Sequence, residues 1–552
     1  MKISSFNISN TLVIMLIQGI LSFVFVSILL YPNLTAQWGI IDDHMIMAFM
    51  GSDQNLSLSE VPSMVLKSEV GMPGFADRYR PFYFLLYITE TALFGNNPSI
   101  RYLSRIFYFG IAILITWRLL SRLFGGVILG GLACLVMLSH SFWGGIWACL
   151  GPSEIYGTVA LAVYSLAFSN LWRESGAKRS ALWWWVLAGA ALVAMGVKEN
   201  FLFLLLPSIA LLYRIWRTDR LSWNVALANT VIIGFGLLVA GAVILAVNKQ
   251  GHDLHSQSIT PASRLQILKD GLFSLKHWQM QLPVCISAFL LALNTLYRWR
   301  RPNNAMLSTL SRILRNLFAL ELGLMLLWYS QYIFYNGAWP DETRYAFPGI
   351  LCRDFAYLLF VSMLPQAVAL LALPERRQLL LKRVYYAVLC AAFIFMTGFG
   401  LKELVKVNQA AQQNRDSTRA FVKSLTNLIE EVKAHPATPI ILESHSVWDI
   451  EPISSVRRFL TVYGVSNPLY LKLEGWSAAA LTTDLEKKLG NRMEKLSRLG
   501  DLDNWYGFIY APQIPFYPIS KIQLNGECFA VGFSGEPISS CRHLGKIYPV
   551  GK

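Results

Sequence analysis

Long apolar segments separated by short basic loops constrain this chain more than any other feature. About 20 apolar residues are enough to cross a bilayer, and the first segment, residues 11–31, is apolar almost throughout. Lipid-exposed backbone must satisfy its own hydrogen bonds, so such a chain folds mostly as helices. We expect a polytopic helical membrane protein with about eleven spans, at residues 11–31, 104–120, 127–143, 153–172, 181–197, 201–215, 223–247, 280–296, 316–335, 348–371 and 384–401.

The charge of the chain agrees with this fold class. Of its 552 residues, 54% are hydrophobic and only 15% are charged, against about 25% in a soluble protein. The net charge of +15 would suggest nucleic-acid binding in a soluble protein. Here the basic residues gather in alternate loops, as expected of the cytoplasmic face and of contact with anionic lipid. We therefore expect membrane lipids as partners and no nucleic acid.

The apolar stretch at residues 81–95 decides the orientation. It has only about 15 residues, which is short for a span. If it crossed the membrane, every later loop would invert and the basic clusters would lie outside, against the positive-inside rule. The sequence therefore predicts a juxtamembrane helix within an outer loop at residues 33–103.

Residues 402–552 have a different character from the transmembrane domain predicted at 1–401. Strand patterns at 439–443, 469–473 and 505–510 alternate with helical patterns at 402–434, 453–462 and 477–499, and residues 526–541 resemble hairpins. This alternation predicts a small extracytoplasmic α/β domain. Cys528 and Cys541 form a plausible disulfide if the domain lies in an oxidising compartment.

Under this topology, acids and bases gather on the outer face, whereas the inner loops are simply basic. The outer residues are Asp42, Asp43, Arg78, Arg80, Glu154, Tyr156, Lys198, Glu199, Asp341, Glu342, Arg344 and Tyr345. A mixture of this kind indicates a polar site rather than a lipid-facing surface.

The order of these motifs resembles the GT-C superfamily of membrane glycosyltransferases, which includes protein O-mannosyltransferases and the aminoarabinose transferases that modify lipid A. Asp42-Asp43 follows the first span, and Arg80-Pro81 begins the short helix. Glu154 follows the third span and Lys198-Glu199 ends the fifth, so the resemblance covers roughly residues 10–220. Relatives often have Lys-Pro-Pro, Asp and Lys-Gly at the last three places.

The resemblance implies an inverting transferase that moves a sugar from a polyprenyl-phosphate donor to a glycan, lipid or protein of the cell envelope. It also implies a bacterial inner membrane, with the site and the C-terminal domain on the periplasmic side. Asp42 would be the general base, and Asp43 would orient the acceptor. The donor phosphate would bind Arg78, Arg80, Lys198 and Arg344, and substrate would contact Glu154, Tyr156, Glu199, Asp341, Glu342 and Tyr345. Some relatives use Mg²⁺ or Mn²⁺, for which Asp43 and Glu154 are the candidate ligands.

Plainer interpretations stay open at this point. The acidic pair could cap a helix, Arg78 and Arg80 could anchor lipid, and Lys198-Glu199 could be a local ion pair. An O-antigen polymerase or ligase would use a late outer loop, here residues 248–278 with His252 and His255. A transporter of lipid-linked glycans would favour paired repeats and ionisable residues at mid-membrane, and the sequence shows neither.

Overall fold

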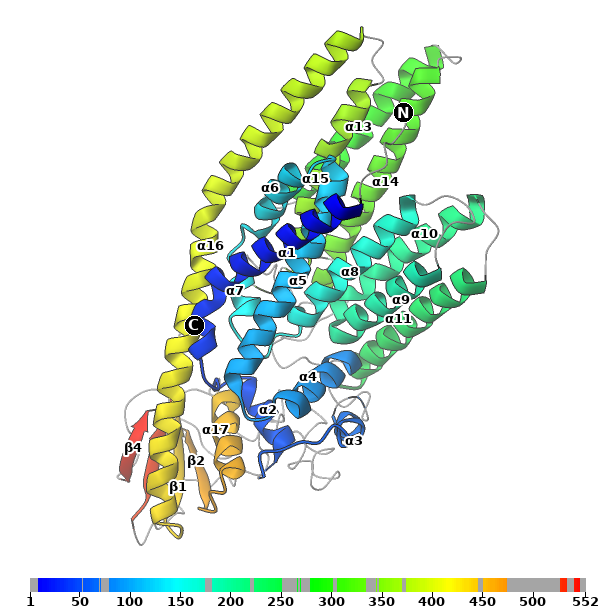
Figure 1. The fold of residues 1–552 in the computed structure, drawn as a ribbon. Coiled ribbons are helices and arrows are strands. Elements are labelled where there is room, and N and C mark those ends of the chain that lie inside the picture. Colours follow the sequence, from blue (N-terminus) through cyan, green and yellow to red (C-terminus); the bar gives the residue numbers. More distant parts are fainter. Residues whose placement is uncertain are drawn as a thin grey trace.

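The computed structural model describes residues 8–51, 53–68, 70, 79–173, 181–218, 223–250, 266, 269, 278–300, 305–333, 344, 347–369, 374–444, 450–473, 527–533 and 541–546. In this part of the chain, 16 α-helices surround a long apolar core and one small sheet lies at the end of the molecule (Figure 1). The fold is therefore mostly helical, as the sequence predicts.

Long helices make the body of the molecule. They are α1 (Ile8–Leu30), α5 (Pro98–Phe124), α6 (Val127–Leu138), α8 (Glu154–Arg173), α9 (Ala181–Val197), α10 (Leu205–Thr218), α11 (Trp223–Gln250), α13 (Trp278–Arg300), α14 (Ala305–Ile333), α15 (Gly349–Ala369) and α16 (Glu375–Ala434). Shorter elements gather toward one end, which we call the site end: η1 (Tyr31–Thr35), α2 (Asp43–Met50), α3 (Val61–Lys67), α4 (Pro81–Phe94), α7 (Phe142–Trp147), η3 (Glu199–Leu204) and α17 (Ile450–Val462).

Seven described helices are long and apolar enough to cross a membrane, which indicates a membrane-embedded protein. They cover Leu12–Thr35, Pro98–Phe124, Glu154–Trp172, Glu199–Arg217, Trp223–Leu245, Gln281–Arg300 and Arg376–Ala434. The predicted count of about eleven is not reached by this criterion. Four predicted spans are not among the seven. The stretch at 127–143 divides into α6 and α7, α9 has only 17 residues, and the stretches at 316–335 and 348–371, in α14 and α15, do not meet the criterion.

The stretch predicted to be too short for a span forms α4, a helix of 14 residues. Pro81 occupies its first turn, where a missing N–H costs nothing, and Gly95 ends it with a φ of +53°. Helix α4 packs against α2, α3 and α9 at the site end of the bundle. The prediction of a short helix here is confirmed.

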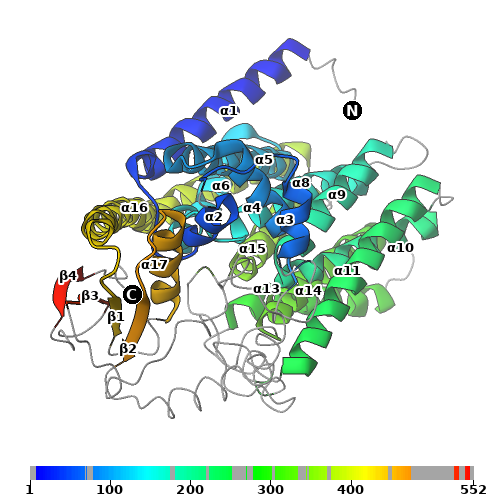
Figure 2. The ribbon, with the colours of Figure 1, turned by 90° about the horizontal axis from the view of Figure 1, so that it is seen from below.

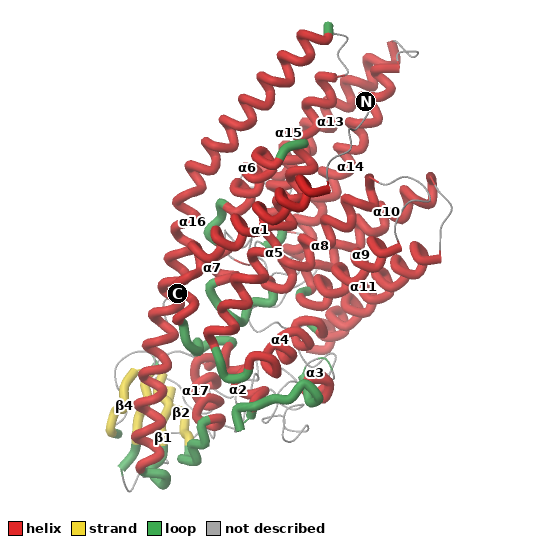
Figure 3. Tube along the Cα trace, in the orientation of Figure 1, coloured by secondary structure: helices red, strands yellow, loops and turns green. Residues whose placement is uncertain are grey.

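Helix α16 crosses the predicted domain boundary between residues 401 and 402. It runs unbroken for 60 residues, from the last apolar segment through the charged pattern at 402–434. The composition changes at Lys402 while the helical periodicity continues and no proline interrupts it, so the helix does not end where the composition changes. Figure 3 shows this single helix passing beside the bundle and ending beside the strands.

The C-terminal sheet contains β1 (Ile440–Ser444), β2 (Leu469–Leu473), β3 (Phe529–Gly532) and β4 (Arg542–Lys546). Its order is β2-β1-β3-β4, and every neighbouring pair is parallel. Parallel pairing of β3 with β4 overturns the hairpins predicted at 526–541. Cys528 and Cys541 form the predicted disulfide, with their Cα atoms 4.9 Å apart. The patterns at 477–499 and 505–510 lie outside the described residues.

The sheet and the site end share one hydrophobic core. Trp38 and Met47 near the acidic pair belong to the same buried cluster as Phe421 of α16, Phe459 of α17 and Phe529 of β3. Seen from below, α2 lies between α4 and α17 (Figure 2). The C-terminal part of the chain thus packs against the loop that carries Asp42 and helps to hold that loop in position.

Candidate functional site

Asp42 lies at the centre of a strained turn. Its φ of 68° and ψ of −44° fall outside the ordinary regions for a residue with a side chain, and the Asp43 N–H donates to the Ile41 carbonyl at 2.8 Å. A bond between residues two apart at these angles defines a classic γ-turn, which is rare. Strain of this kind is concentrated at functional sites. The Asp42 side chain makes no capping hydrogen bond to α2, which argues against a simple helix cap.

Gly151 provides the space for Asp42. A Cβ atom on Gly151 would lie 2.2 Å from the Asp42 Cβ and 2.5 Å from its Oδ2, so only glycine fits here. The Tyr83 hydroxyl of α4 donates to the Gly151 carbonyl at 2.9 Å. The acidic turn is therefore held against the segment that leads into α8.

Asp43 is buried beside this turn, with 3% of its surface exposed. The Gly39 N–H donates to its Oδ2 at 2.7 Å. The pKa of Asp43 is raised to about 7, first by burial and then by the charge of Asp42, against the lowering effects of the Gly39 hydrogen bond and of the charges of Arg101 and Arg105. Asp43 thus titrates near neutral pH, unlike an exposed aspartate.

Two ion pairs join the helices next to the turn. Glu154, the first residue of α8, pairs with Lys198 at the end of α9, and both side chains are buried. Glu199 pairs with Arg80 at the start of α4, at 3.2 Å. Because Lys198 and Glu199 are consecutive, this one dipeptide connects α8 and α4. Two of the four predicted phosphate-binding cations, Arg80 and Lys198, thus already contact carboxylates.

Arg344 approaches the same place from a distant part of the chain. A Cβ atom added to Gly145 in α7 would lie 3.7 Å from the Cβ of Arg344, so the two residues are close together. The charge of Arg344 acts on Glu154 and on Cys149, and Asp42 and Asp43 act on Cys149 as well. Its carbonyl accepts from the Phe347 N–H at 3.3 Å. Arg344 is partly exposed, so a ligand can reach it.

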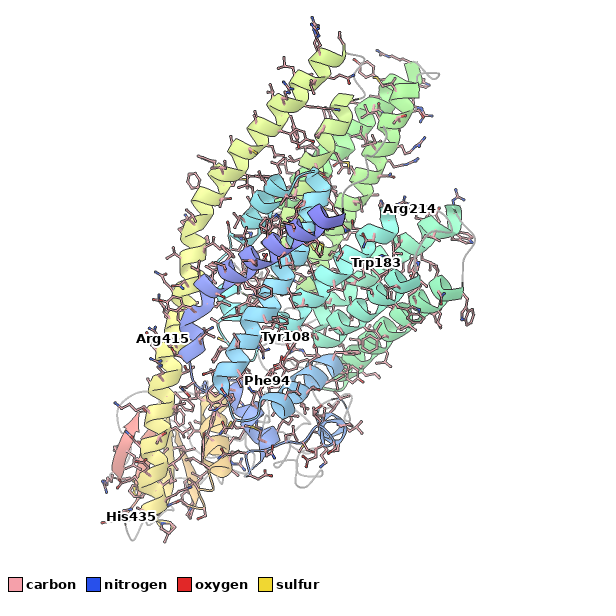
Figure 4. The ribbon with its side chains drawn as sticks, viewed as in Figure 1. Phe94, Tyr108, Trp183, Arg214, Arg415 and His435 are labelled. Carbon is pink, nitrogen blue, oxygen red and sulfur yellow. A yellow bond between two sulfur atoms is a disulfide. The ribbon has the colours of Figure 1, made fainter. Side chains whose placement is uncertain are left out.

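Tyr156 and a network that the sequence analysis missed lie deeper. Arg105 of α5 donates to both carboxylate oxygens of Glu90 in α4, at 2.9 Å each. Its guanidinium also lies over the rings of Tyr156 and Tyr108, 5.4 and 5.9 Å from the ring centroids. Figure 4 shows Tyr108 on α5, near α4. Tyr156 is therefore buried in this structure, against the guanidinium of Arg105. Paired arginines at the start of an apolar span were the signal for this network.

The other predicted contacts have mixed outcomes. Arg78, Asp341, Glu342 and Tyr345 lie outside the described residues. Within the described ranges, no three His, Cys, Asp or Glu side chains come together as metal ligands. Asp43 is held by Gly39 and Glu154 by Lys198, so neither candidate Mg²⁺ or Mn²⁺ ligand gains support.

Comparison with known proteins does not identify a family for this chain. No protein-family model matches the chain, and no curated protein matches it. The resemblance to GT-C glycosyltransferases therefore depends on the order of the motifs.

Proposed function

We propose that this chain is an inverting glycosyltransferase that uses a polyprenyl-phosphate sugar and acts on an extracytoplasmic acceptor of the cell envelope. The observation that carries the proposal is the strained turn at Asp42, held against Gly151 beside Glu154, Lys198 and Arg344. These residues come from four separate segments and meet at one end of a helical membrane protein.

The exposure of the acids supports a single displacement. Asp42 is partly exposed, whereas Asp43, Glu154 and Glu199 are 3%, 3% and 8% exposed. One accessible carboxylate suits a general base, which contributes about 10²–10⁴-fold in rate. Asp42 takes the proton of the acceptor hydroxyl while the hydroxyl oxygen forms a bond to the anomeric carbon of the donor sugar. The bond from that carbon to phosphate breaks, and direct attack inverts the configuration.

The departing phosphate needs a cation. Arg344 is the best candidate among the described residues, because it is partly exposed and its guanidinium can contact a phosphate through two donors. Arg80 and Lys198 are already paired, so we assign them to holding the site together. The alternation of basic loops supports a site on the outer face of the membrane, and the disulfide agrees with an oxidising compartment. The resemblance to GT-C glycosyltransferases implies that this membrane is a bacterial inner membrane.

The test uses purified protein in detergent and a panel of short-chain polyprenyl-phosphate sugars. We measure donor binding and the release of polyprenyl phosphate in the presence of a cell-envelope extract. The parent should release polyprenyl phosphate, Asp42→Asn should bind donor without turnover, and Arg344→Ala should lose binding.

The matched control is Asp53→Asn, which removes an exposed acid from the same loop and should behave as the parent. Full turnover by Asp42→Asn would refute the proposal. Movement of a glycolipid across vesicles without covalent change would favour a transporter instead.

A further inference from the structure

Two polar side chains of α16 are bonded to the two chain segments that meet where Asp42 lies against Gly151. We call residues 33–42 the first segment and residues 147–151 the second segment. Asn414 and Thr418 are four residues apart, so they lie on one face of α16. The helix packs here against η1 and α7, and Figure 4 labels Arg415 where α16 passes the end of α1.

The first segment is bound at Gln37. The Gln37 N–H donates to the Thr418 hydroxyl at 3.0 Å. The Gln37 carbonyl accepts from the Tyr102 hydroxyl at 3.5 Å, and that hydroxyl accepts from the Asn414 amide at 3.0 Å. Both backbone groups of Gln37 are therefore connected to α16, only a few residues before Asp42.

The second segment is bound through Asn33. The Asn414 amide also donates to Asn33 Oδ1 at 3.2 Å. The Asn33 amide donates to the Ala148 carbonyl at 3.1 Å and to the Trp147 carbonyl at 3.5 Å. Asn33, Trp147 and Ala148 are buried, so their polar groups would be costly to leave without these bonds. Asn414 is thus connected to the chain just before Gly151.

The chemistry of the groups makes this network depend on the Asn414 amide. A side-chain amide has two N–H donors, and those of Asn414 go to Asn33 and Tyr102. The single proton of Tyr102 then serves the Gln37 carbonyl. An aspartate at position 414 would have no donor, and its carboxylate would compete for the protons of Asn33 and Tyr102. Both segments would then lose hydrogen bonds together.

We propose that Asn414 and Thr418 are positioning residues, which hold Asp42 against Gly151 and so set the reach of the base toward the acceptor. The inference rests on the proposed function. Both residues act through the backbone of the two segments and take no part in the proton transfer. A displacement of about 1 Å near the reacting groups can cost about 10²-fold in rate, so bonds at this distance from Asp42 can control kcat.

The first test needs no activity and uses Cys149, whose thiol lies 3.9 Å from Asn414 Oδ1. We measure alkylation of Cys149 by N-ethylmaleimide in detergent, by mass spectrometry of its peptide. In Asn414→Asp the rate should rise about five- to tenfold, the change expected when the closed segment loses one net hydrogen bond. A carboxylate beside the thiol disfavours the reactive thiolate, so a faster rate reports opening of the second segment.

The matched control is Asn408→Asp on the same helix. The Asn408 amide also donates to backbone carbonyls, those of Ile28 and Leu29 at the end of α1. This substitution removes the same kind of bond but leaves both segments bound, so the alkylation rate of Cys149 should match that of the parent. If Asn414→Asp also matches the parent, Asn414 does not hold the second segment and the inference fails.

The second test separates kcat from KM in the release of polyprenyl phosphate. Asn414→Asp should lower kcat about 10- to 100-fold and leave the donor KM within about twofold, because the lost bonds do not involve Arg344. Thr418→Val keeps the volume of the side chain, removes the bond to Gln37 and should lower kcat in the same way. Asn408→Asp should keep both constants.

The outcomes separate this inference from the proposed function. Faster alkylation of Cys149 in Asn414→Asp with an unchanged kcat refutes the positioning role. If Asn414→Asp does not fold, kcat of Thr418→Val decides the question. If the parent turns over no polyprenyl-phosphate sugar, the proposed function fails and the positioning role fails with it, whereas alkylation still shows whether Asn414 holds the second segment.

Discussion

The two halves of the site treat charge in opposite ways. Where α8, η3 and the start of α4 meet, the acids and bases are matched as Glu154 with Lys198 and Glu199 with Arg80. Around the Asp42 turn, Asp43 accepts a backbone N–H, and the Arg101 side chain has no hydrogen-bond acceptor within the described part of the chain. We call these the paired half and the turn half.

The difference teaches which charges hold the fold and which are available for chemistry. A matched buried pair fixes the geometry of its helices, but its charges are already balanced by each other. The turn half combines a strained backbone with a carboxylate that titrates near neutral pH. Both features reduce stability, which is the usual cost of an active site.

The largest effect should come from breaking the paired half. Lys198→Ala leaves Glu154 buried without its cation and should destabilise the protein by about 3–5 kcal/mol. Thermal unfolding in detergent measures this loss. The double variant Glu154→Gln with Lys198→Met should recover much of it, because no charge is then stranded. If Lys198→Ala keeps its stability and loses donor binding, Lys198 belongs with the chemistry.

Gly151→Ala should damage the turn half directly. The added Cβ would displace Asp42, so we expect a loss of about 1–3 kcal/mol from overpacking together with a loss of transfer. The measurements are Tm and polyprenyl-phosphate release. Gly189→Ala is the control, since nothing lies within 4 Å of a Cβ at Gly189 in α9. Normal transfer by Gly151→Ala would show that the position of Asp42 is unimportant.

Asp42→Gly should separate stability from function. Glycine accepts a positive φ without strain, so folding should gain on the order of 1 kcal/mol even after the entropy cost of glycine. Transfer should disappear, because the carboxylate is gone. A fall in Tm would mean that the Asp42 side chain stabilises the turn, and the contrast between the halves would weaken.

Asp416→Asn should have the smallest effect. Asp416 pairs with Arg415 at 2.7 Å on the surface of α16, where the Asp416 side chain is 65% exposed; Arg415 is labelled in Figure 4. Exposed pairs contribute little, so Tm and transfer should stay within experimental error. A clear loss would show that burial is not what distinguishes the paired half.

The sequence predicted the helical class, the short helix at 81–95, observed at 81–94, and the strands at 439–443 and 469–473, of which the first is observed at 440–444, because periodicity and length are local signals. It also placed Asp42, Glu154, Lys198 and Arg344 in one region, through the alternation of basic loops. It could not predict that Lys198 pairs with Glu154. Partners across the fold depend on packing, which no spacing along the chain reveals.

The γ-turn and Arg101 were missed for a related reason. Strain at Asp42 depends on Gly151 in another segment, and an arginine in the first turn of a span usually indicates an interface anchor. The change of composition at residue 401 falls within a continuous helix, so it did not mark the end of a helix. The hairpin prediction was wrong because the direction of a strand depends on its connection.

Because it is continuous, helix α16 also fixes the rotation of the sheet about the helix axis relative to the bundle. Its 60 residues span about 90 Å at 1.5 Å each, roughly three times the hydrocarbon thickness of a bilayer. One inserted residue would turn everything beyond it by about 100°. The number of residues between Tyr385 and Phe421 is therefore fixed. The Tyr385 hydroxyl donates to a carbonyl of α15, and Phe421 packs in the core shared with the sheet. Changes of length in this helix should be tolerated only in steps that restore the same face.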